Sequence, residues 1–538
     1  MLWQTAALVA GGSIVTAREA DAQPAGAVIG QTEGAAAGDA VLAAGGNAVD
    51  AAVAAALVAG VVAVPMTGIG GYGGHMVIAK PDDGGRRGKV FALDFNTAAP
   101  AAAREDMFPV DERGVVKDQR NQYGWLAAGV PGVLAGLQLA LDRFGSKPLA
   151  ELLEPAIRYA REGFTVNKAL AAAFKSARDR LARDPGSAKL FFAHGEPFAE
   201  GAKLRNPDLA DMLESLAERG RVDDFYRGKI ADKIAAAFRR HGALVTADDL
   251  SAYRAIEVVP LALDWQGYTI YMPPLTAGGL TVLQALAAIK SLGWVEMDEQ
   301  DPSTVQARVE SLRIAWTDRL ERLGDPKHVE VPIERLLSDD YAAQSAERIR
   351  AAIKQRKPTQ GQSDRRPAGG TIHLSAADKS GMMAALTFTH GNSLGAQVTV
   401  DGLGLVLGHG MSRFDPQPGK PNSPGPGKRP LNNMCPTIVA RGGKPVMALG
   451  ATGGRRIVNT VFDFLAYRLG IGRSLTESVQ APRVHTEGDL KLTLEASWPP
   501  KVKEHFKKIG YDVAIGPAAR LNAIERDSAS GSLRSAAR

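Results

Sequence analysis

A glycine–threonine pair at the start of a strand-like segment has the residue types needed for nucleophilic chemistry. A polar, Gly/Pro-rich run ends at Gly370, and Thr371-Ile372-His373-Leu374-Ser375 follows. Cleavage between Gly370 and Thr371 would make Thr371 a new N-terminus, with its hydroxyl as the nucleophile and its own α-amine as the base. A free α-amine has a pKa of roughly 7.7–8.0, so it can accept a proton near neutral pH. The alternative is a Gly-Thr pair that merely opens a strand.

Two adjacent glycines, Gly453 and Gly454, lie between a predicted strand and a predicted helix. Backbone N–H groups at such a place can point at a developing oxyanion, helped by the positive end of the helix. The alternative is a tight turn that needs glycine for a positive φ. A second glycine-rich run, residues 68–74, lacks the Gly-Lys-Ser/Thr ending of a phosphate loop and indicates close backbone packing instead.

The remaining reactive residue types predict no metal site and no cofactor. The nine histidines are scattered, and no pair has zinc-ligand spacing with a third ligand nearby. His373 alternates with Thr371 and Ser375 along the strand, and we expect it to form structural hydrogen bonds. The single cysteine, Cys435, lies beside an apolar run and is expected to be a small buried side chain.

A β-hairpin is expected to position Thr371. Predicted strands over Thr371–Ala376 and Met383–Thr389 flank Asp378-Lys379-Ser380-Gly381, which is typical of a turn. If Ala377 pairs with Met383, Thr371 lies opposite Thr389 on the same face, where a second hydroxyl could hold it in place. A slip of one residue would destroy this arrangement.

The rest of the chain divides into a helix-rich part and a strand-rich part. Before Thr371 the pattern predicts capped, Ala-rich helices, such as one over Ala48–Ala59 after Asn47. After Thr371 further strands are expected over Gly402–Leu407 and Pro436–Ala440, and a helix over Arg456–Leu469. With 538 residues, 45% hydrophobic and 6% aromatic, the chain is long enough for one large body of helices on sheets. The net charge of +6 is spread without a basic stripe, which argues against a nucleic-acid partner.

The first 25 residues could be a signal or a disordered segment. Leu2–Val15 is mostly apolar, and Ala20-Asp21-Ala22-Gln23 resembles a small-residue cleavage site, although a basic segment before it is missing. We favour an exported precursor and hence a periplasmic or secreted protein over a simple tail. No run elsewhere is long and apolar enough to span a membrane.

The order of motifs resembles the γ-glutamyltransferase family of N-terminal-nucleophile (Ntn) hydrolases. The resemblance runs from about Gly26 to Asp512. Its most specific segments are Thr371-x-His373-x-Ser375, Lys428-Arg429-Pro430-Leu431, Pro436-Thr437-Ile438 and Gly453-Gly454.

This resemblance implies an α+β fold, a four-layer αββα sandwich, and a precursor that cuts itself before Thr371. It implies a large-subunit region (26–353), a mobile linker ending at the cleavage site (354–370) and a small-subunit region (371–538), interwoven in one body. The two pieces would be roughly 39 and 18 kDa by residue count, and two such heterodimers could associate. By the same resemblance Thr371 is the nucleophile, Thr389 supports it, and Gly453 and Gly454 supply the oxyanion hole.

The expected substrate contacts depart from the family at the carboxylate. The family binds the α-carboxylate of the γ-glutamyl group with an arginine, and this position is Asn96 here. Two serines that contact the same carboxylate are replaced by Asn432 and Asn433. Replacing arginine by asparagine removes a bidentate carboxylate clamp.

The contacts to the α-amine depart as well. The family uses an Asn, a Gln and an Asp, and the corresponding positions are Gly391, Gly410 and Arg413. An arginine in place of the aspartate would repel an α-ammonium. Losing one partner of a desolvated charge contact costs on the order of 2–5 kcal/mol, so ordinary use of glutathione is not expected.

Three functions remain open from the sequence. The first is a self-processed amide hydrolase whose small substrate carries an acyl carboxylate that meets Arg413. The second is a true γ-glutamyl hydrolase or transpeptidase that binds its substrate through shifted residues such as Asn392 or Arg455. The third is an unprocessed, catalytically silent binding protein.

Overall fold

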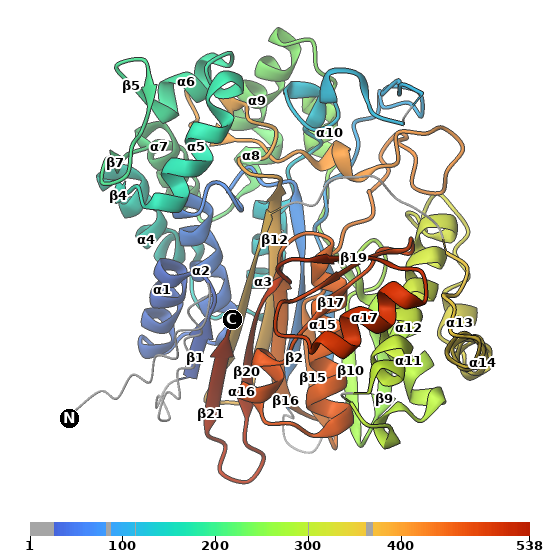
Figure 1. Cartoon of the computed structure of the whole chain (residues 1–538). Coiled ribbons are helices and arrows are strands. Elements are labelled where there is room, and N and C mark those ends of the chain that lie inside the picture. Colours follow the sequence, from blue (N-terminus) through green and yellow to red (C-terminus); the bar gives the residue numbers. More distant parts are fainter. Residues whose placement is uncertain (1–25, 82–87, 113, 300, 362–369) are drawn as a thin grey trace.

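Two antiparallel sheets lie face to face between two helical layers (Figure 1). The computed structural model describes residues 26–81, 88–112, 114–299, 301–361 and 370–538. The predicted signal segment therefore lies outside the described residues, as do residues 362–369 of the predicted linker. Within the described ranges no helix is both long and apolar enough to cross a membrane.

The first sheet holds the predicted hairpin at its centre. Its strands, in spatial order, are β1 (Gly26–Ile29), β11 (Gly370–Asp378), β12 (Met383–Gly391), β2 (Gly73–Lys80), β3 (Lys89–Asp94) and β8 (Ile256–Val258). Strands β11 and β12 thus lie between strands from the first part of the chain, and the regions on either side of Gly370 are interwoven.

The second sheet is built mainly from the C-terminal third of the chain. Its strands, in spatial order, are β21 (Leu533–Ala537), β20 (Arg520–Arg526), β16 (Lys444–Thr452), β15 (Thr437–Arg441), β10 (Tyr268–Met272) and β9 (Leu261–Trp265). Its contact with the first sheet is lined by small and aliphatic side chains, including Val77, Ala385 and Ala448.

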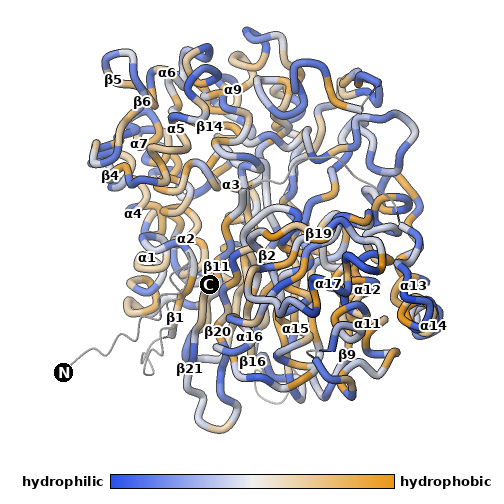
Figure 2. Tube along the Cα trace, in the orientation of Figure 1, coloured by the Kyte–Doolittle hydropathy of each residue, from blue (hydrophilic) through white to orange (hydrophobic). Residues whose placement is uncertain are grey.

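Helices cover the outer face of each sheet, which completes the four layers expected from the resemblance. The first layer contains α1 (Thr32–Ala43), α2 (Ala48–Val62), α3 (Val133–Phe144) and α4 (Leu149–Glu162). The second contains α11 (Gly279–Leu292), α12 (Pro302–Arg322) and α15 (Arg456–Leu465). Figure 2 shows hydrophobic segments in both layers, near the labels α2 and α11.

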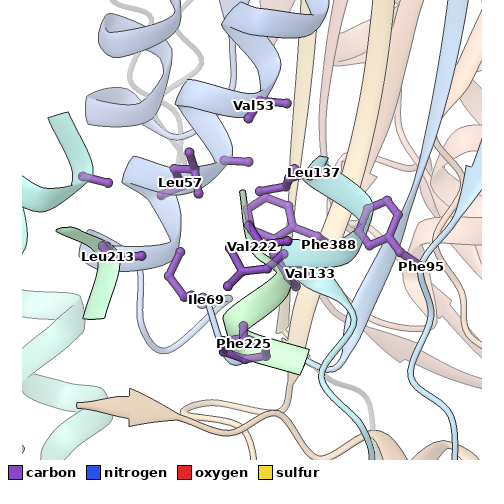
Figure 3. Packing of buried hydrophobic residues seen from close by; sticks show 14 of the residues in the cluster. Val53, Leu57, Ile69, Phe95, Val133, Leu137, Leu213, Val222, Phe225 and Phe388 are labelled. Carbon is purple, nitrogen blue, oxygen red and sulfur yellow. The ribbon is translucent and has the colours of Figure 1, made fainter. Parts of the chain in front are cut away.

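Helix α2 shows why the first layer forms where it does. Asn47 caps it by accepting hydrogen bonds from the N–H groups of Val49 and Asp50, and every residue from Ala48 to Val62 is buried. Small side chains allow α1, α4 and the sheet to approach it from several sides. Figure 3 shows Val53 and Leu57 of this helix in the same packed cluster as Phe388 of β12.

Three expectations need correction. The strand expected over Gly402–Leu407 is reduced to β14 (Leu405–Val406), because Gly402 and Gly404 have positive φ and form a turn. The helix expected over Arg456–Leu469 is α-helical only to Leu465 and continues as a π-helix over Ala466–Ile471. The expected linker starts two residues too early, since α14 (Asp339–Gln355) includes Lys354 and Gln355; the mobility of the linker stays a prediction.

Candidate active site

The side chains of Thr371 and Thr389 lie together at one end of the β11–β12 pair. Ala377 pairs with Met383, and the register continues to Ile372 opposite Phe388. A bulge follows between Gly370 and Ile372, and there the two threonine hydroxyls are 3.4 Å apart. The pairing predicted from the sequence is therefore confirmed.

The turn of the hairpin explains why this register is fixed. Asp378 accepts hydrogen bonds from the N–H of Ser380 (2.8 Å) and from its hydroxyl (2.6 Å), and Gly381 has φ +97°. Asp378 also accepts from the N–H of Ala48 at the start of α2, at 2.9 Å. The far end of the strand pair is thus tied to the helical layer, and a slip would break these bonds.

The carbonyl oxygen of Gly370 accepts hydrogen bonds from the hydroxyls of Thr371 and Thr389. Thr371 Oγ1 lies 2.5 Å from this oxygen and Thr389 Oγ1 lies 2.6 Å from it. Thr389 Oγ1 in turn accepts the N–H of Gly391 at 2.7 Å. The carbonyl of the predicted cleavage site is therefore held by the two groups that the sequence singled out.

Side chains along β11 and β12 alternate between two faces, so the polar residues near the site and the core residues point in opposite directions. Phe388, next to Thr389, points into the helical layer and lies near Val133 and Leu137 of α3 in Figure 3. Odd-numbered residues of β11 point to the other face, toward the second sheet. There the N–H of His373 donates to Thr452 Oγ1 of β16 at 3.1 Å.

His373 has structural partners on both ring nitrogens. Nδ1 lies 2.7 Å from Thr387 Oγ1 and Nε2 lies 3.0 Å from Ser375 Oγ. Burial lowers the pKa of His373 to about 3, so the ring is neutral near neutral pH. The role expected for it, structural hydrogen bonding, is confirmed.

The predicted oxyanion glycines follow β16 directly. Gly453 has φ +145° and Gly454 has φ +64°, conformations that favour glycine. Both precede α15, and Gly454 lines the same recess as Thr371. Gly453 is not among the described lining residues, and the oxyanion role of the pair stays a prediction.

A recess opens at Thr371, with an empty volume of about 220 Å³ that includes open solvent. Its described lining consists of Tyr72, Gly370, Thr371, Gly391, Arg413, Asn433, Met434, Gly454 and Ile457. Two of the four residues predicted to bind substrate, Arg413 and Asn433, therefore lie beside the predicted nucleophile.

We call Tyr72, Arg413 and Asn433 the wall of the recess. The other two predicted substrate residues, Asn96 and Asn432, lie behind this wall, outside the described lining. Asn96 is fully buried, and its amide donates to Thr276 Oγ1 (2.7 Å) and to the carbonyl of Pro430 (2.6 Å). Asn432 donates to His75 Nε2 at 2.9 Å. Both asparagines support neighbouring segments in this structure, and a direct substrate contact for them stays a prediction.

Tyr72 is a wall residue that the sequence reasoning missed. Burial raises the pKa of its phenol, and the charge of Arg413 opposes part of that rise, so the phenol keeps its proton near neutral pH. The signal was present, because Tyr72 is a single aromatic residue inside the run Gly70-Gly71-Tyr72-Gly73-Gly74. Its position in the same lining as Arg413, which the sequence does not reveal, identifies it as a residue of the site.

The described residues offer no ready metal site. None of the clusters that the structure describes brings together three or more His, Cys, Asp or Glu side chains able to hold an ion. Cys435 is buried and unbridged, as expected, and burial raises the pKa of its thiol to about 12.

Comparison with known proteins decides the family. The family model described as gamma-glutamyltranspeptidase matches residues 34–537. The chain belongs to the gamma-glutamyltranspeptidase family. It is an enzyme with the Ntn-hydrolase fold that acts on amides, which removes the alternative of a silent binding protein.

Relatives with two different activities are similar to this chain. The glutathione hydrolase proenzyme of Escherichia coli (strain K12) is 36% identical over 474 residues, covering 84% of this chain and 80% of that protein. The acylase ACY 1 proenzyme of Pseudomonas sp. (strain V22) is 34% identical over 445 residues, covering 81% and 79%. Among solved structures, the cephalosporin acylase from Bacillus halodurans has a TM-score of 0.85 at 26% identity, covering 99% of this chain and 97% of that one.

Proposed function

We propose that the protein is a self-processed N-terminal threonine amide hydrolase whose substrate carries a carboxylate on its acyl group. The observation that carries this proposal is the meeting of three groups in one recess: the Thr371 hydroxyl, the Gly370 carbonyl and the Arg413 guanidinium. Proenzyme names among the relatives support a precursor that is cut.

In the maturation step Thr371 Oγ1 attacks the carbonyl carbon of Gly370. An ester to Oγ1 forms as the C–N bond between Gly370 and Thr371 breaks, and the hydroxyl proton passes to the nitrogen, which becomes the free α-amine. Water then hydrolyses the ester, which leaves a carboxylate on Gly370 and restores the Thr371 hydroxyl. Thr389 Oγ1, 2.6 Å from the carbonyl oxygen, stabilises the negative charge that develops there.

In the catalytic cycle the α-amine of Thr371 takes the hydroxyl proton as Oγ1 attacks the amide carbon of the substrate. The N–H groups of Gly453 and Gly454 stabilise the oxyanion, and the proton passes to the departing amine. Water then attacks the acyl-enzyme ester and releases the acid. An amine in place of water would give transfer instead of hydrolysis.

The charge of the wall supports an anionic acyl group. Arg413 carries a guanidinium of the kind that binds carboxylates, and its Nη2 lies 3.4 Å from His409 Nε2. Tyr72, with its protonated phenol, lies in the same wall. The same guanidinium would repel the α-ammonium of a γ-glutamyl group. A glutaryl-type acyl chain, which has the carboxylate but no ammonium, satisfies both conditions.

A γ-glutamyl hydrolase or transpeptidase is the second candidate. The name of the Escherichia coli relative favours it. Asn392 directly follows Gly391, which lines the recess, and its amide donates to Gln122 Oε1 at 3.2 Å. Arg455 follows Gly454 directly and forms an ion pair with Glu487.

Intact mass and N-terminal sequencing, followed by a pair of p-nitroanilides, test the proposal. We expect two chains, the smaller beginning Thr-Ile-His-Leu-Ser, and faster release from glutaryl-p-nitroanilide than from γ-glutamyl-p-nitroanilide. Faster turnover of the γ-glutamyl compound would favour the second candidate. A single uncut chain without activity would contradict both.

A further inference from the structure

A second recess lies beside the nucleophile and carries three arginines. Its empty volume is about 310 Å³, open solvent included, and its described lining consists of Trp316, Arg319, Ser412, Arg413, Leu431, Asn433 and Arg455. Arg413 and Asn433 line both recesses, so the two cavities adjoin at these side chains. No aspartate or glutamate occurs among the described lining residues.

The indole of Trp316 forms a platform for two of these arginines. The guanidinium carbons of Arg319 and Arg455 lie 5.6 Å and 5.8 Å from its ring centroid, which is within cation–π range. The indole N–H donates to Asn459 Oδ1 at 3.0 Å, and the amide of Asn459 donates to the carbonyl of Thr486, also at 3.0 Å. The platform is therefore fixed by buried hydrogen bonds.

The guanidinium groups are also anchored individually. Arg319 Nη2 donates to the carbonyl oxygen of Asn432 at 2.6 Å, and Arg455 forms an ion pair with Glu487. Such anchoring holds long side chains in place before any ligand arrives, which lowers the entropy lost on binding. Glu487 offsets part of the charge of Arg455, and the charged residues of the described lining are all arginines, which favours ligands of the opposite charge.

We infer that this arginine recess binds a second anionic group of the substrate. The acyl group would carry two acid functions: one at Arg413 beside the nucleophile, and one between Arg319 and Arg455. Trp316 lies against both guanidinium groups, so its indole would sense the arrival of that second acid group. This inference rests on the proposed function, because the acyl carbonyl must lie at Thr371 for the chain to extend in this direction.

Three p-nitroanilides and one free acid test the inference. The anilides derive from butyric acid, glutaric acid and a terminal carboxyl of propane-1,2,3-tricarboxylic acid, and they carry no, one and two remaining carboxylates. We expect kcat/KM to rise about tenfold or more from the second to the third compound, since hydrogen bonds to charged groups are among the stronger polar contacts that a second carboxylate can add. Free propane-1,2,3-tricarboxylate should change the tryptophan fluorescence of the processed enzyme, and Trp316→Phe should abolish that change.

The arginine variants give matched controls. Arg455→Gln should lower the preference for the third anilide over the second, and Arg455→Lys should restore part of it. Arg239→Gln, an exposed arginine on α9 (Lys229–Arg240), should leave the preference unchanged. If Arg455→Gln does not mature, the fluorescence titration of the wild type beside Trp316→Phe still decides the question.

The two hypotheses fail in different ways. Fluorescence binding of the tricarboxylate without cleavage of any anilide would overturn the proposed function and keep the arginine recess. Cleavage of glutaryl-p-nitroanilide with no gain for the third anilide and no fluorescence change would overturn the inference alone.

Discussion

The strand pair that holds Thr371 and the wall that faces it are built in different ways. Strands β11 and β12 are regular, adjacent in the sequence and joined by a short turn. The wall comes from segments far apart in the chain: Tyr72 precedes β2, Arg413 ends a short 3-10 helix (Gly410–Arg413), and Asn433 lies in an irregular segment before β15. We therefore propose that reaction type and substrate choice are set by two separate parts of one recess.

Removal of the nucleophile gives the largest expected effect and tests the strand pair. Thr371→Ala should remain a single chain and lose activity by about 10⁴-fold or more, as removal of a nucleophile does elsewhere. Intact mass and p-nitroanilide release measure the two consequences. Thr371→Ser is the matched control, since it keeps a hydroxyl and should still be cut, more slowly. A fully cut or active alanine variant would show that the threonine is not the nucleophile.

Removal of the second hydroxyl tests whether the pair acts as a unit. Thr389→Val keeps the shape of the side chain and deletes the donor to the Gly370 carbonyl. Loss of one such donor slows acyl chemistry by about 10²- to 10³-fold, so the variant should accumulate as uncut precursor in a time course of intact mass. Thr389→Ser should behave like the wild type. Equal maturation rates for the valine variant and the wild type would remove Thr389 from the mechanism.

The strand pair could be predicted from sequence, and the wall only in part: Arg413 and Asn433 were expected near the nucleophile, whereas Tyr72 was missed. The alternation of Thr371, His373 and Ser375 and the turn at Asp378 fix a local register, because strand pairing follows turn geometry. Asn96 and Asn432 were expected in the substrate site, yet their amides hydrogen-bond to Pro430 and His75 behind the wall. Their orientation depends on contacts between residues more than 300 positions apart, which no local pattern encodes.

The C-terminal strands were missed for a related reason. Strands β20 and β21 complete the second sheet, but their sequences mix charged and apolar residues without clear alternation. Asn522 of β20 donates to the carbonyl of His373 at 3.0 Å, so this strand also supports the nucleophile strand. A long-range partner, not intrinsic propensity, defines these strands.

A change of charge in the wall should alter substrate choice while leaving maturation intact. Arg413→Met should lower kcat/KM for glutaryl-p-nitroanilide by about thirtyfold or more, since loss of one partner of a desolvated charge pair costs on the order of 2–5 kcal/mol. Butyryl-p-nitroanilide, which lacks the carboxylate, gives the baseline for the same variant. An equal loss on both compounds would mean that Arg413 holds the wall together and does not select the substrate.

Acid should lower the free energy of unfolding through buried histidines in both regions. The effect of each histidine should be smaller than that of the substitutions above. Burial lowers the pKa of His373, beside the nucleophile, to about 3. Burial also lowers the pKa of His75, which contacts Asn432 behind the wall, to about 4; the charge of Asp94 opposes this shift and that of Arg429 adds to it. Unfolded histidines have a pKa of about 6.5, so between that value and the folded pKa the unfolded chain binds protons that the folded chain does not. Each histidine should then remove up to about 1.4 kcal/mol of unfolding free energy per pH unit as the pH falls.

Urea unfolding of the uncut Thr371→Ala chain at about pH 7 and about pH 5 measures this loss as a shift of the transition midpoint, and an uncut chain avoids dissociation of the two subunits. His75→Gln keeps an acceptor for Asn432 and removes one proton-binding group from both states, so its stability should fall less steeply with acid. His194→Asn changes an exposed histidine outside both regions and is the control. A free energy of unfolding that is the same at both pH values would contradict neutral, buried rings at His75 and His373. His75→Gln could also leave the pH dependence of the unfolding free energy unchanged while a loss with acid remains. In that case the ring of His75 would be accessible to water in the folded chain, and the wall would be more open than the strand pair.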